Sequence, residues 1–315
     1  MILSKAPRLG RRQFLGAAAG LAGSTLLSSQ PIWASTRTVF KFGTLEALVM
    51  SDGHFALPTG FLVDPDAPPA ARETALKSAG HGGDQIQLVN NVVMIRSPSA
   101  VILVDAGAGP RHQPTAGKLI DNLKAAGIEP TTVTQVVLTH GHPDHLWGIL
   151  DVNNNLLYPN ASYVVSAAEW SVWSDPDVMR KLPTVLANDR IVNGARRHFS
   201  RIQEMIRMVR HGDEIISGVR VIDTPGHTPG HMAVELAGEN GLLIAGDALT
   251  HEVISFQHPS WRVTVDHEPD RGISTRLRLL DRLATDKHRL LGAHLPFPGT
   301  GFVERAHGSY RFVAA

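Results

Sequence analysis

The sequence predicts an α+β fold that forms one domain. Strand-rich and helix-rich blocks recur in each half of the chain, and no stretch has the composition of a linker between domains. The 315 residues are 43% hydrophobic and 19% charged, which is enough apolar material to fill one sizeable core. The local signals along the chain agree with this class.

Short apolar runs that end in turn residues predict the strands, at residues 38–42, 45–51, 89–95, 100–104, 133–138, 162–165, 219–222, 232–236, 242–245 and 290–291. Apolar residues at helical spacing predict the helices, at residues 117–126, 167–173, 195–210 and 271–284. Ser51-Asp52-Gly53 is a turn signal. Residues 64–83 are rich in Pro, Ala, Gly and Asp, which favours a loop with at most one short helix at residues 70–78.

The amino-terminal segment has the pattern of a targeting signal. Arg11-Arg12-Gln13-Phe14-Leu15 precedes an apolar run of small residues at 16–27, and the pair resembles a twin-arginine export signal. The run is too short to predict a bilayer-spanning helix. We therefore expect a signal peptide at residues 1–34, a mature domain at residues 35–315 and an exported, periplasmic or secreted protein. An uncleaved membrane anchor is the alternative.

The bulk composition excludes several kinds of site and partner. The chain contains no cysteine, so disulfides and thiolate metal ligands are excluded and His and carboxylate sites are left. The net charge is +1, the sequence pI is about 8.2 and no basic run is present, so we expect no nucleic-acid partner. We expect a small-molecule substrate instead.

Residues 139–145, Thr-His-Gly-His-Pro-Asp-His, carry the strongest chemical signal. His140, His142, Asp144 and His145 fall within six positions, and imidazole and carboxylate suit zinc and neighbouring transition metals. The stretch follows the apolar run 133–138, so these side chains would lie at the carboxyl end of a buried strand, where α/β sheets place their chemistry. A histidine-rich surface loop is the structural alternative.

Other candidate ligands follow predicted strands further along the chain. They are His227 or His231, Asp247 and His294. Asp247 would be shared by two metal ions, because a carboxylate has two oxygens with lone pairs to spare. Asp105 ends the strand at residues 100–104, where it either caps the following turn or accepts a hydrogen bond from a ligand histidine.

A few side chains are candidates for the wall of a substrate pocket, namely Trp173, Thr250, Phe256 and Val265. Trp173 stands beside Ser174-Asp175-Pro176, where a helix should end. The loop 108–114 carries Arg111 and His112 and could rim the pocket. We also expect residues 54–62 to form an exposed apolar loop that could join two copies as a homodimer.

Together these motifs resemble the metallo-β-lactamase superfamily. The resemblance rests on residues 140–145, the Pro-Gly-His-Thr-Pro-Gly-His stretch at residues 225–231, Gly246-Asp247 and His294, and it covers most of the mature chain. It implies a four-layer αββα sandwich and two divalent metal ions, expected to be Zn²⁺. It also implies that His231 is the ligand and His227 a structural neighbour. The implied ligand sets are His140, His142 and His231 for one ion, Asp144, His145 and His294 for the other, and Asp247 for both.

Residues 43–58, residues 293–299 and Tyr310-Arg311-Phe312-Val313 further resemble methyl parathion hydrolase and its relatives. Those enzymes are exported dizinc hydrolases of organophosphate triesters, aryl esters and lactones. The resemblance implies a binuclear hydrolase of esters or lactones, with organophosphate triesters as further candidates. In this hypothesis a hydroxide that bridges the metal ions attacks the substrate, and Asp144 accepts a proton as the intermediate collapses.

Three other functions are alternatives to this hypothesis. Metallo-β-lactamases without a cysteine ligand generally lack a bridging Asp at the position of Asp247, which argues against β-lactam hydrolysis. Glyoxalase II shares the ligand set and hydrolyses thioesters, but it is normally not exported. A non-catalytic exported metal-binding protein would close its coordination shell, whereas a catalytic site keeps one position open.

Overall fold

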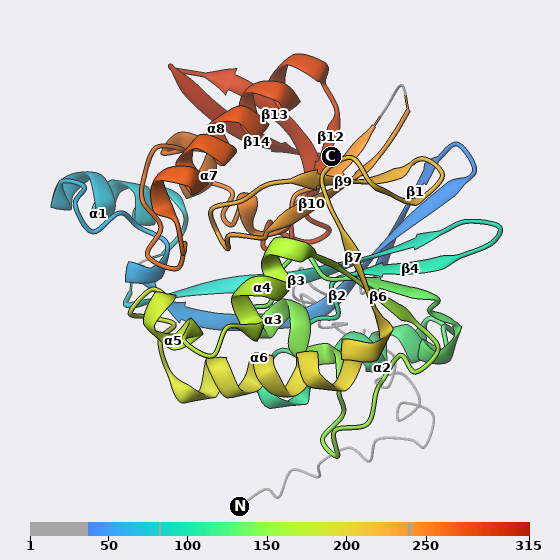
Figure 1. The fold of residues 1–315 in the computed structure, drawn as a ribbon. Helices are drawn as coiled ribbons and strands as arrows, with labels where there is room; N and C mark the ends of the chain where they lie inside the picture. The colour runs from blue at the N-terminus through green and yellow to red at the C-terminus, as the bar shows by residue number, and fades with distance from the viewer. Residues whose placement is uncertain (1–36, 82, 239–240) are drawn as a thin grey trace, which may run out of the picture. The chain divides into compact units, whose positions relative to one another are not determined.

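Two seven-stranded β-sheets organise the computed structural model, which describes residues 37–81, 83–238 and 241–315 (Figure 1). The first sheet contains, in order, β1 (Arg37–Phe42), β2 (Leu45–Pro58), β3 (Gln85–Arg96), β4 (Val101–Val104), β5 (Gln135–Val137), β6 (Ser162–Ser166) and β7 (Ile206–Val209). The second sheet contains, in order, β14 (Ser309–Ala314), β13 (Thr300–Ala306), β12 (Arg289–Leu291), β11 (Leu242–Ile244), β10 (Met232–Leu236), β9 (Val219–Asp223) and β8 (Glu214–Ile216).

Helices cover the outer faces of the sheets. The α-helices are α1 (Pro69–Ser78), α2 (Leu119–Ala125), α3 (Pro143–Leu146), α4 (Ala167–Ser174), α5 (Val178–Lys181), α6 (Asp189–Ile202), α7 (Ile254–Gln257) and α8 (Pro269–Asp286). Short 3-10 helices lie at Thr59–Phe61, Gly109–Arg111, Pro130–Thr132, Trp147–Ile149, Gln203–Met205 and Gly246–Ala248. Figure 1 shows α3, α4, α5 and α6 on the side of the first sheet, and α7 and α8 beside the second.

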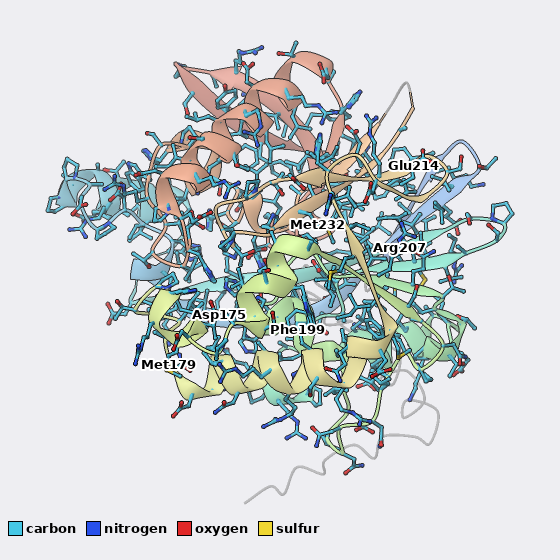
Figure 2. All side chains as sticks on the ribbon, in the orientation of Figure 1. Asp175, Met179, Phe199, Arg207, Glu214 and Met232 are labelled. Atoms are coloured by element: carbon cyan, nitrogen blue, oxygen red, sulfur yellow. The ribbon has the colours of Figure 1, made fainter. Side chains whose placement is uncertain are left out.

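Three apolar cores separate four layers. Phe199 of α6, labelled in Figure 2, belongs to the core between the first sheet and its helices. Met232, also labelled there, belongs to the core between the two sheets. Leu279 and Leu283 of α8 fill the core on the outer face of the second sheet. The predicted four-layer αββα sandwich is therefore confirmed.

The alternation of side chains along β2 explains how one strand serves two cores. Leu48 and Met50 pack into the helix-facing core, whereas Ala47 and Val49 pack between the sheets. Successive residues of a strand point to opposite faces of its sheet. A strand that is covered on both faces therefore reads as a continuous apolar run, which is how the central strands appear in this sequence.

The parallel strands determine where loops meet. β4, β5, β6 and β7 pair in parallel in the first sheet, and β11 and β12 pair in parallel in the second. The carboxyl ends of parallel neighbours lie at the same edge of a sheet, so the segments that follow them are neighbours as well. All of the candidate ligands lie in these segments except His227 and His231, which follow the antiparallel strand β9.

One predicted helix is wrong in its bounds. The helix expected at residues 195–210 begins earlier, as α6, because the Asn188 side chain accepts a hydrogen bond from the backbone N–H of Ile191 and caps it. It also ends earlier, and residues 206–209 form β7, which pairs with β6. Pairing with a neighbouring strand outweighs helical spacing here, and spacing alone does not reveal that pairing.

Other differences concern the ends of the domain and one turn. The turn expected at Ser51-Asp52-Gly53 is a bulge inside β2, where the register with β3 shifts between Ser51 and His54. Gly53 has a φ of +94°, which favours glycine over any side chain at this bulge. β8, β13 and β14 were not predicted: β8 is only three residues long and β14 lies at the edge of the second sheet, whereas β13 lies inside that sheet, between β14 and β12.

The predicted signal peptide at residues 1–34 lies outside the described residues. Among the residues that the structure describes, no helix combines the length and the apolar character that crossing a bilayer requires.

Candidate metal centre

The first set of candidate ligands lies directly after β5. His140 lies between β5 and α3, and His142 is the N-cap residue immediately before α3. Pro143 occupies the first turn of α3, where its missing N–H and fixed φ favour a helix start. This short helix carries Asp144 and His145 immediately beside the loop that carries the other two histidines. The local sequence thus concentrates four polar side chains at one strand end.

The remaining candidates come from three strand ends of the second sheet. His227 lies in the connection between β9 and β10, Asp247 lies in the 3-10 helix after β11, and His294 follows β12. Since β11 and β12 run in parallel, Asp247 and His294 emerge at the same edge of that sheet. All of these side chains are buried.

The structure brings seven side chains together in two groups. The histidine group comprises His140, His142 and His227, and the carboxylate group comprises Asp144, His145, Asp247 and His294. Within each group, one potential ligand atom of every residue lies within 4.8 Å of the others.

Asp247 lies between the two groups and faces both. Its Oδ1 is 3.2 Å from His145 Nε2 and 3.1 Å from His294 Nε2. Its Oδ2 is 3.3 Å from His227 Nε2 and 4.0 Å from His140 Nε2. Each carboxylate oxygen therefore belongs to a different group, which is the arrangement expected of a shared ligand.

The choice of His231 over His227 is corrected by this geometry. His231 belongs to neither group, and both of its ring nitrogens have other partners. Its Nδ1 is 2.7 Å from Thr224 Oγ1, and its Nε2 accepts a hydrogen bond of 2.9 Å from the backbone N–H of Asp247. Burial lowers the pKa of His231 to about 3, so the ring is neutral and can accept that bond. His231 therefore holds the backbone of Asp247, and His227 stands in the histidine group where His231 was expected.

Each histidine of the two groups has a hydrogen-bond partner on its outer nitrogen. His145 Nδ1 is 2.8 Å from Asp105 Oδ2, which is the contact anticipated for Asp105. His294 Nδ1 is 2.8 Å from the carbonyl oxygen of Val89. The other outer contacts are His140 Nδ1 to Thr139 Oγ1 at 3.0 Å, His142 Nε2 to His267 Nε2 at 3.1 Å and His227 Nδ1 to Asp266 Oδ1 at 2.9 Å.

These outer acceptors favour rings that carry their proton outside and a lone pair inside. The inner nitrogens then face one another at short range, since His142 Nδ1 and His227 Nε2 are only 2.9 Å apart. His140 Nε2, His145 Nε2 and Asp247 Oδ1 are buried and make no hydrogen bond within the described residues. Buried lone pairs that converge without donors are costly unless a cation lies among them. The residues therefore fit two metal ions.

Electrostatics distinguish the two groups. Burial lowers the pKa values of His140 and His142 well below the ordinary value for histidine, so these two rings favour the neutral state. Burial acts in the same direction on His294, but Asp247 and Asp144 outweigh it and raise its pKa to about 10. The carboxylate group thus attracts positive charge strongly, whether as protons or as a metal ion.

Glu169 ties together the two loops that supply the histidine group. Its Oε1 accepts hydrogen bonds of 2.7 Å from the backbone N–H of Gly141 and from Trp173 Nε1. Its Oε2 accepts a bond of 2.5 Å from Thr228 Oγ1. Gly141 separates His140 from His142, and Thr228 follows His227, so one buried carboxylate connects both ligand-bearing loops. Nothing in the sequence pattern had singled out Glu169.

A cavity of about 300 Å³ opens onto the two groups, and Asp144, Asp247 and His294 form part of its floor. Thr250 and Val265 line it, as predicted, and so does His112 from the loop expected to rim it. Most of the remaining wall is apolar. The other lining residues, apart from further metal-group side chains, include Phe55, Leu57, Pro58, Phe61, Leu62, Leu88, Gln113, Val185, Leu186, Asn188, Arg190 and Ile191.

Two predicted wall residues lie elsewhere. Trp173 is 2% exposed and packs behind the site, with its ring centroid 6.1 Å from that of His142. Phe256 is fully buried in the outer core of the second sheet and packs against Phe312. Both are large and apolar, and burial in a core satisfies them better than a half-open wall. They do not line the cavity.

Residues 54–62 are not an exposed loop. They form the second half of β2 and the following 3-10 helix, and six of them line the cavity. The apolar side chains of residues 54–62, which suggested a homodimer contact, therefore contribute to the cavity wall. The signal that could have revealed this is the apolar stretch Phe55-Ala56-Leu57, which continues the apolar run of residues 45–50 beyond the bulge.

Comparisons with known proteins show which family this sequence matches. The sequence model described as "Metallo-beta-lactamase superfamily" matches residues 86–303. Metallo-beta-lactamase domain-containing protein 1 of Xenopus laevis is 27% identical over 203 residues, which cover 63% of this chain and 69% of that protein. For other curated relatives the matched share of their length is between 46% and 68%.

Two solved structures resemble the whole domain. The dizinc quorum-quenching lactonase AidC, in complex with a product, superposes with a TM-score of 0.82 at 27% identity, covering 89% of this chain and 98% of AidC. The hydrolase AbOPH superposes with a TM-score of 0.82 at 28% identity, again covering 89% of this chain and 98% of that structure.

Proposed function

This chain belongs to the metallo-beta-lactamase superfamily, and from that premise we propose that it hydrolyses lactones or esters with two divalent metal ions. The observation that carries the proposal is the position of Asp247. Its two carboxylate oxygens each face one of the two ligand groups, and both groups lie at the floor of a cavity. A protein that only stores metal has no need for such a cavity beside the ligands.

The ligand atoms would divide as the two groups do. His140 Nε2, His142 Nδ1 and His227 Nε2 would hold one ion, while Asp144, His145 and His294 would hold the other, and Asp247 would serve both. Imidazole and carboxylate ligands suit Zn²⁺, which is our choice of metal. Two divalent ions bound here would lower the pKa of a water molecule and polarise the substrate's electrophilic oxygen.

The chain's own residues would position the substrate and exclude water. The apolar wall, with Phe61, Leu186 and Ile191, suits a substrate that carries an alkyl or aryl group. Arg190 and Gln113 add polar groups at the same cavity. Substrate bound there would have its ester bond beside the metal groups and most of its apolar surface removed from water.

Asp144 is the residue that we assign to proton transfer. Its side chain is 13% exposed, which is more than any other member of the two groups, and it lines the cavity. Its Oδ2 lies 3.3 Å from both His145 Nε2 and His294 Nε2, so it faces the same point as the two rings. A carboxylate at this point can receive a proton and return it to the leaving oxygen.

Lactones are our first choice of substrate, and two findings support them. AidC, which this chain resembles over nearly its whole length, is a lactonase. The cavity volume of about 300 Å³ with an apolar wall is also adequate for a lactone ring with a short acyl chain. Aryl esters have the same electrophilic carbonyl, and organophosphate triesters are a further candidate for the same cavity.

A panel of substrates tests the proposal. Protein loaded with Zn²⁺ would be assayed with acylated lactones, aryl esters, a phosphotriester, a chromogenic β-lactam and a thioester. We expect kcat/KM to be highest for lactones or esters, to disappear after chelation and to return with added metal. Activity that survives complete chelation contradicts the proposal. Two tightly bound metal ions without turnover of any substrate would instead indicate a metal-binding protein.

Export is proposed on the sequence alone. The paired arginines Arg11-Arg12 support a twin-arginine route, which carries proteins across the membrane in the folded state. In a bacterial host, the unaltered chain should appear in the periplasmic fraction, and a chain with both arginines changed to lysine should stay in the cytoplasm. Equal export of both chains would remove this support.

A further inference from the structure

The stretch between α7 and α8 touches two of the three histidines in the histidine group. Asp266 Oδ1 lies 2.9 Å from the outer nitrogen of His227, and His267 Nε2 lies 3.1 Å from the outer nitrogen of His142. Asp266 and His267 are adjacent in sequence, so one short segment supports two ligands from two different loops. Neither residue belongs to the groups themselves.

This segment is fastened to the loop that carries His227. The backbone N–H of His267 donates to the carbonyl oxygen of His227 at 3.0 Å, and that of Glu268 donates to the carbonyl oxygen of Gly226 at 2.9 Å. A Cβ on Gly226 would lie 2.2 Å from the backbone nitrogen of Gly272 in α8, so the loop that carries His227 is in contact with α8. The position of Asp266 and His267 relative to the site is therefore set by backbone contacts.

A buried arginine holds the Asp266 carboxylate. Arg276 of α8 is 4% exposed, and one of its terminal nitrogens lies 3.3 Å from Asp266 Oδ2. Its other terminal nitrogen donates to the carbonyl oxygens of Pro259 and Trp261, both at 2.9 Å. Because Arg276 binds Oδ2, Asp266 Oδ1 remains directed at His227. The guanidinium also compensates the charge of the Asp266 carboxylate, which is only 4% exposed.

His267 and His142 face each other through their Nε2 atoms, which lie 3.1 Å apart, so one of the two nitrogens donates to the other. Its ring centroid lies 5.3 Å from that of His142 and 6.1 Å from that of Trp173, so the ring is packed between them. With His142 Nε2 donating to His267, the lone pair of His142 remains on Nδ1, which faces the histidine group. An imidazole can carry its proton on either nitrogen, and the acceptor on the outer side decides which one.

We propose that Asp266 and His267 are positioning residues that orient His227 and His142 toward the metal ion of the histidine group. The inference rests on the proposed function, because it assumes that a metal ion binds there. Outer partners of ligand histidines typically contribute a factor of about 10 to 100 in metal affinity. The carboxylate group has its own outer partners, Asp105 and the carbonyl of Val89, so its affinity should be unaffected.

The decisive variant is His267→Phe. Phenylalanine retains an aromatic ring between His142 and Trp173 but lacks the acceptor nitrogen, so packing and positioning are separated. His258→Phe is the matched control, since His258 lies in the same connection and stacks on Trp261, with ring centroids 4.0 Å apart and no contact with the groups. Asp266→Asn is the second variant, which keeps an oxygen acceptor but removes the charge.

The readout is Zn²⁺ affinity, measured by titrating metal-free protein in competition with a chelator. Reference variants His227→Ala and His294→Ala, each lacking one ligand, assign the two binding steps to the two groups. We expect His267→Phe to weaken the step of the histidine group about 10- to 100-fold. The other step, and the melting temperature of the metal-free protein, should match the His258→Phe control. Asp266→Asn should weaken the same step.

Two outcomes would overturn the inference and leave the proposed function standing. One is unchanged affinity at both steps in His267→Phe and Asp266→Asn, and the other is an equal loss at both steps. If the unaltered protein binds fewer than two ions, the proposed function fails, and this inference fails with it.

Discussion

Asp105→Asn is the substitution that tests most directly how the ligand histidines are held. Asp105 is 5% exposed and accepts hydrogen bonds from the backbone N–H of Thr139 at 2.8 Å, from Thr139 Oγ1 at 2.9 Å and from His145 Nδ1 at 2.8 Å. Its φ is +63°, a left-handed conformation that asparagine adopts readily, so the backbone should be retained. The amide also has nearly the same size as the carboxylate.

The expected loss of metal affinity follows from the hydrogen-bond donors around residue 105. An asparagine oxygen at the position of Oδ1 keeps both bonds to Thr139, but the amide NH₂ then replaces Oδ2 and faces His145 Nδ1–H. Two donors cannot remain at that distance, so His145 must move its proton to Nε2 or rotate. Either change removes the lone pair that faces Asp144 and Asp247. We expect a 10- to 100-fold loss in affinity, or about 1.4–2.7 kcal/mol.

Competition with a chelator measures this loss, and the reference variants described above identify the binding step. Only the step of the carboxylate group should weaken. Glu235→Gln is the matched control, because Glu235 is 2% exposed and pairs with Arg220 and Arg282, away from both groups. That control should lower stability and leave both metal affinities unchanged. Unaltered affinity in Asp105→Asn, or a loss at the histidine group instead, would refute the reasoning.

Two further predictions concern the loop and the stability of the domain. In Gly141→Ala the new Cβ would lie 2.2 Å from Trp173 Nε1, so the loop or the ring must shift. We expect a loss of about 1–3 kcal/mol in the free energy of unfolding, measured with denaturant. We also expect loss of metal from the histidine group, measured by metal analysis. A normal metal content in that variant would contradict the role given to the loop. Burial lowers the pKa of His198 from 6.5 to about 4. Below pH 6.5 the unfolded state therefore binds more protons than the folded state, and the free energy of unfolding decreases as the pH is lowered. Between pH 7 and 5 the metal-free protein should lose about 2 kcal/mol more than His198→Gln, as compared by urea unfolding, and parallel pH profiles would show that His198 does not contribute.

The local chemistry was readable in the sequence. His140, His142, Asp144 and His145 are neighbours along the chain, and the strand before them is visible as an apolar run. Asp247 and His294 follow strands of the same kind, and parallel strands that end at one edge bring such residues together. The strands themselves were predictable because both faces are covered, which makes them uniformly apolar.

Contacts between distant segments are not encoded in any local period. The sequence offers His227 and His231 as alternative ligands. Only the fold shows that His231 Nε2 already accepts a hydrogen bond from the backbone N–H of Asp247. Glu169 and Asp266 reach the site from a helix and from a connection whose sequences carry no metal motif.

The residue pattern was sufficient to predict the class of fold, the kind of ligand and six of the seven side chains that the structure groups around two centres. These depend on residue type and on short-range pattern, which a linear sequence contains. The tertiary structure alone decided which histidine completes the histidine group, what holds each ring and which side chains form the cavity wall. Those depend on which surfaces of sheets and helices meet, because a ring is oriented by its neighbours in space.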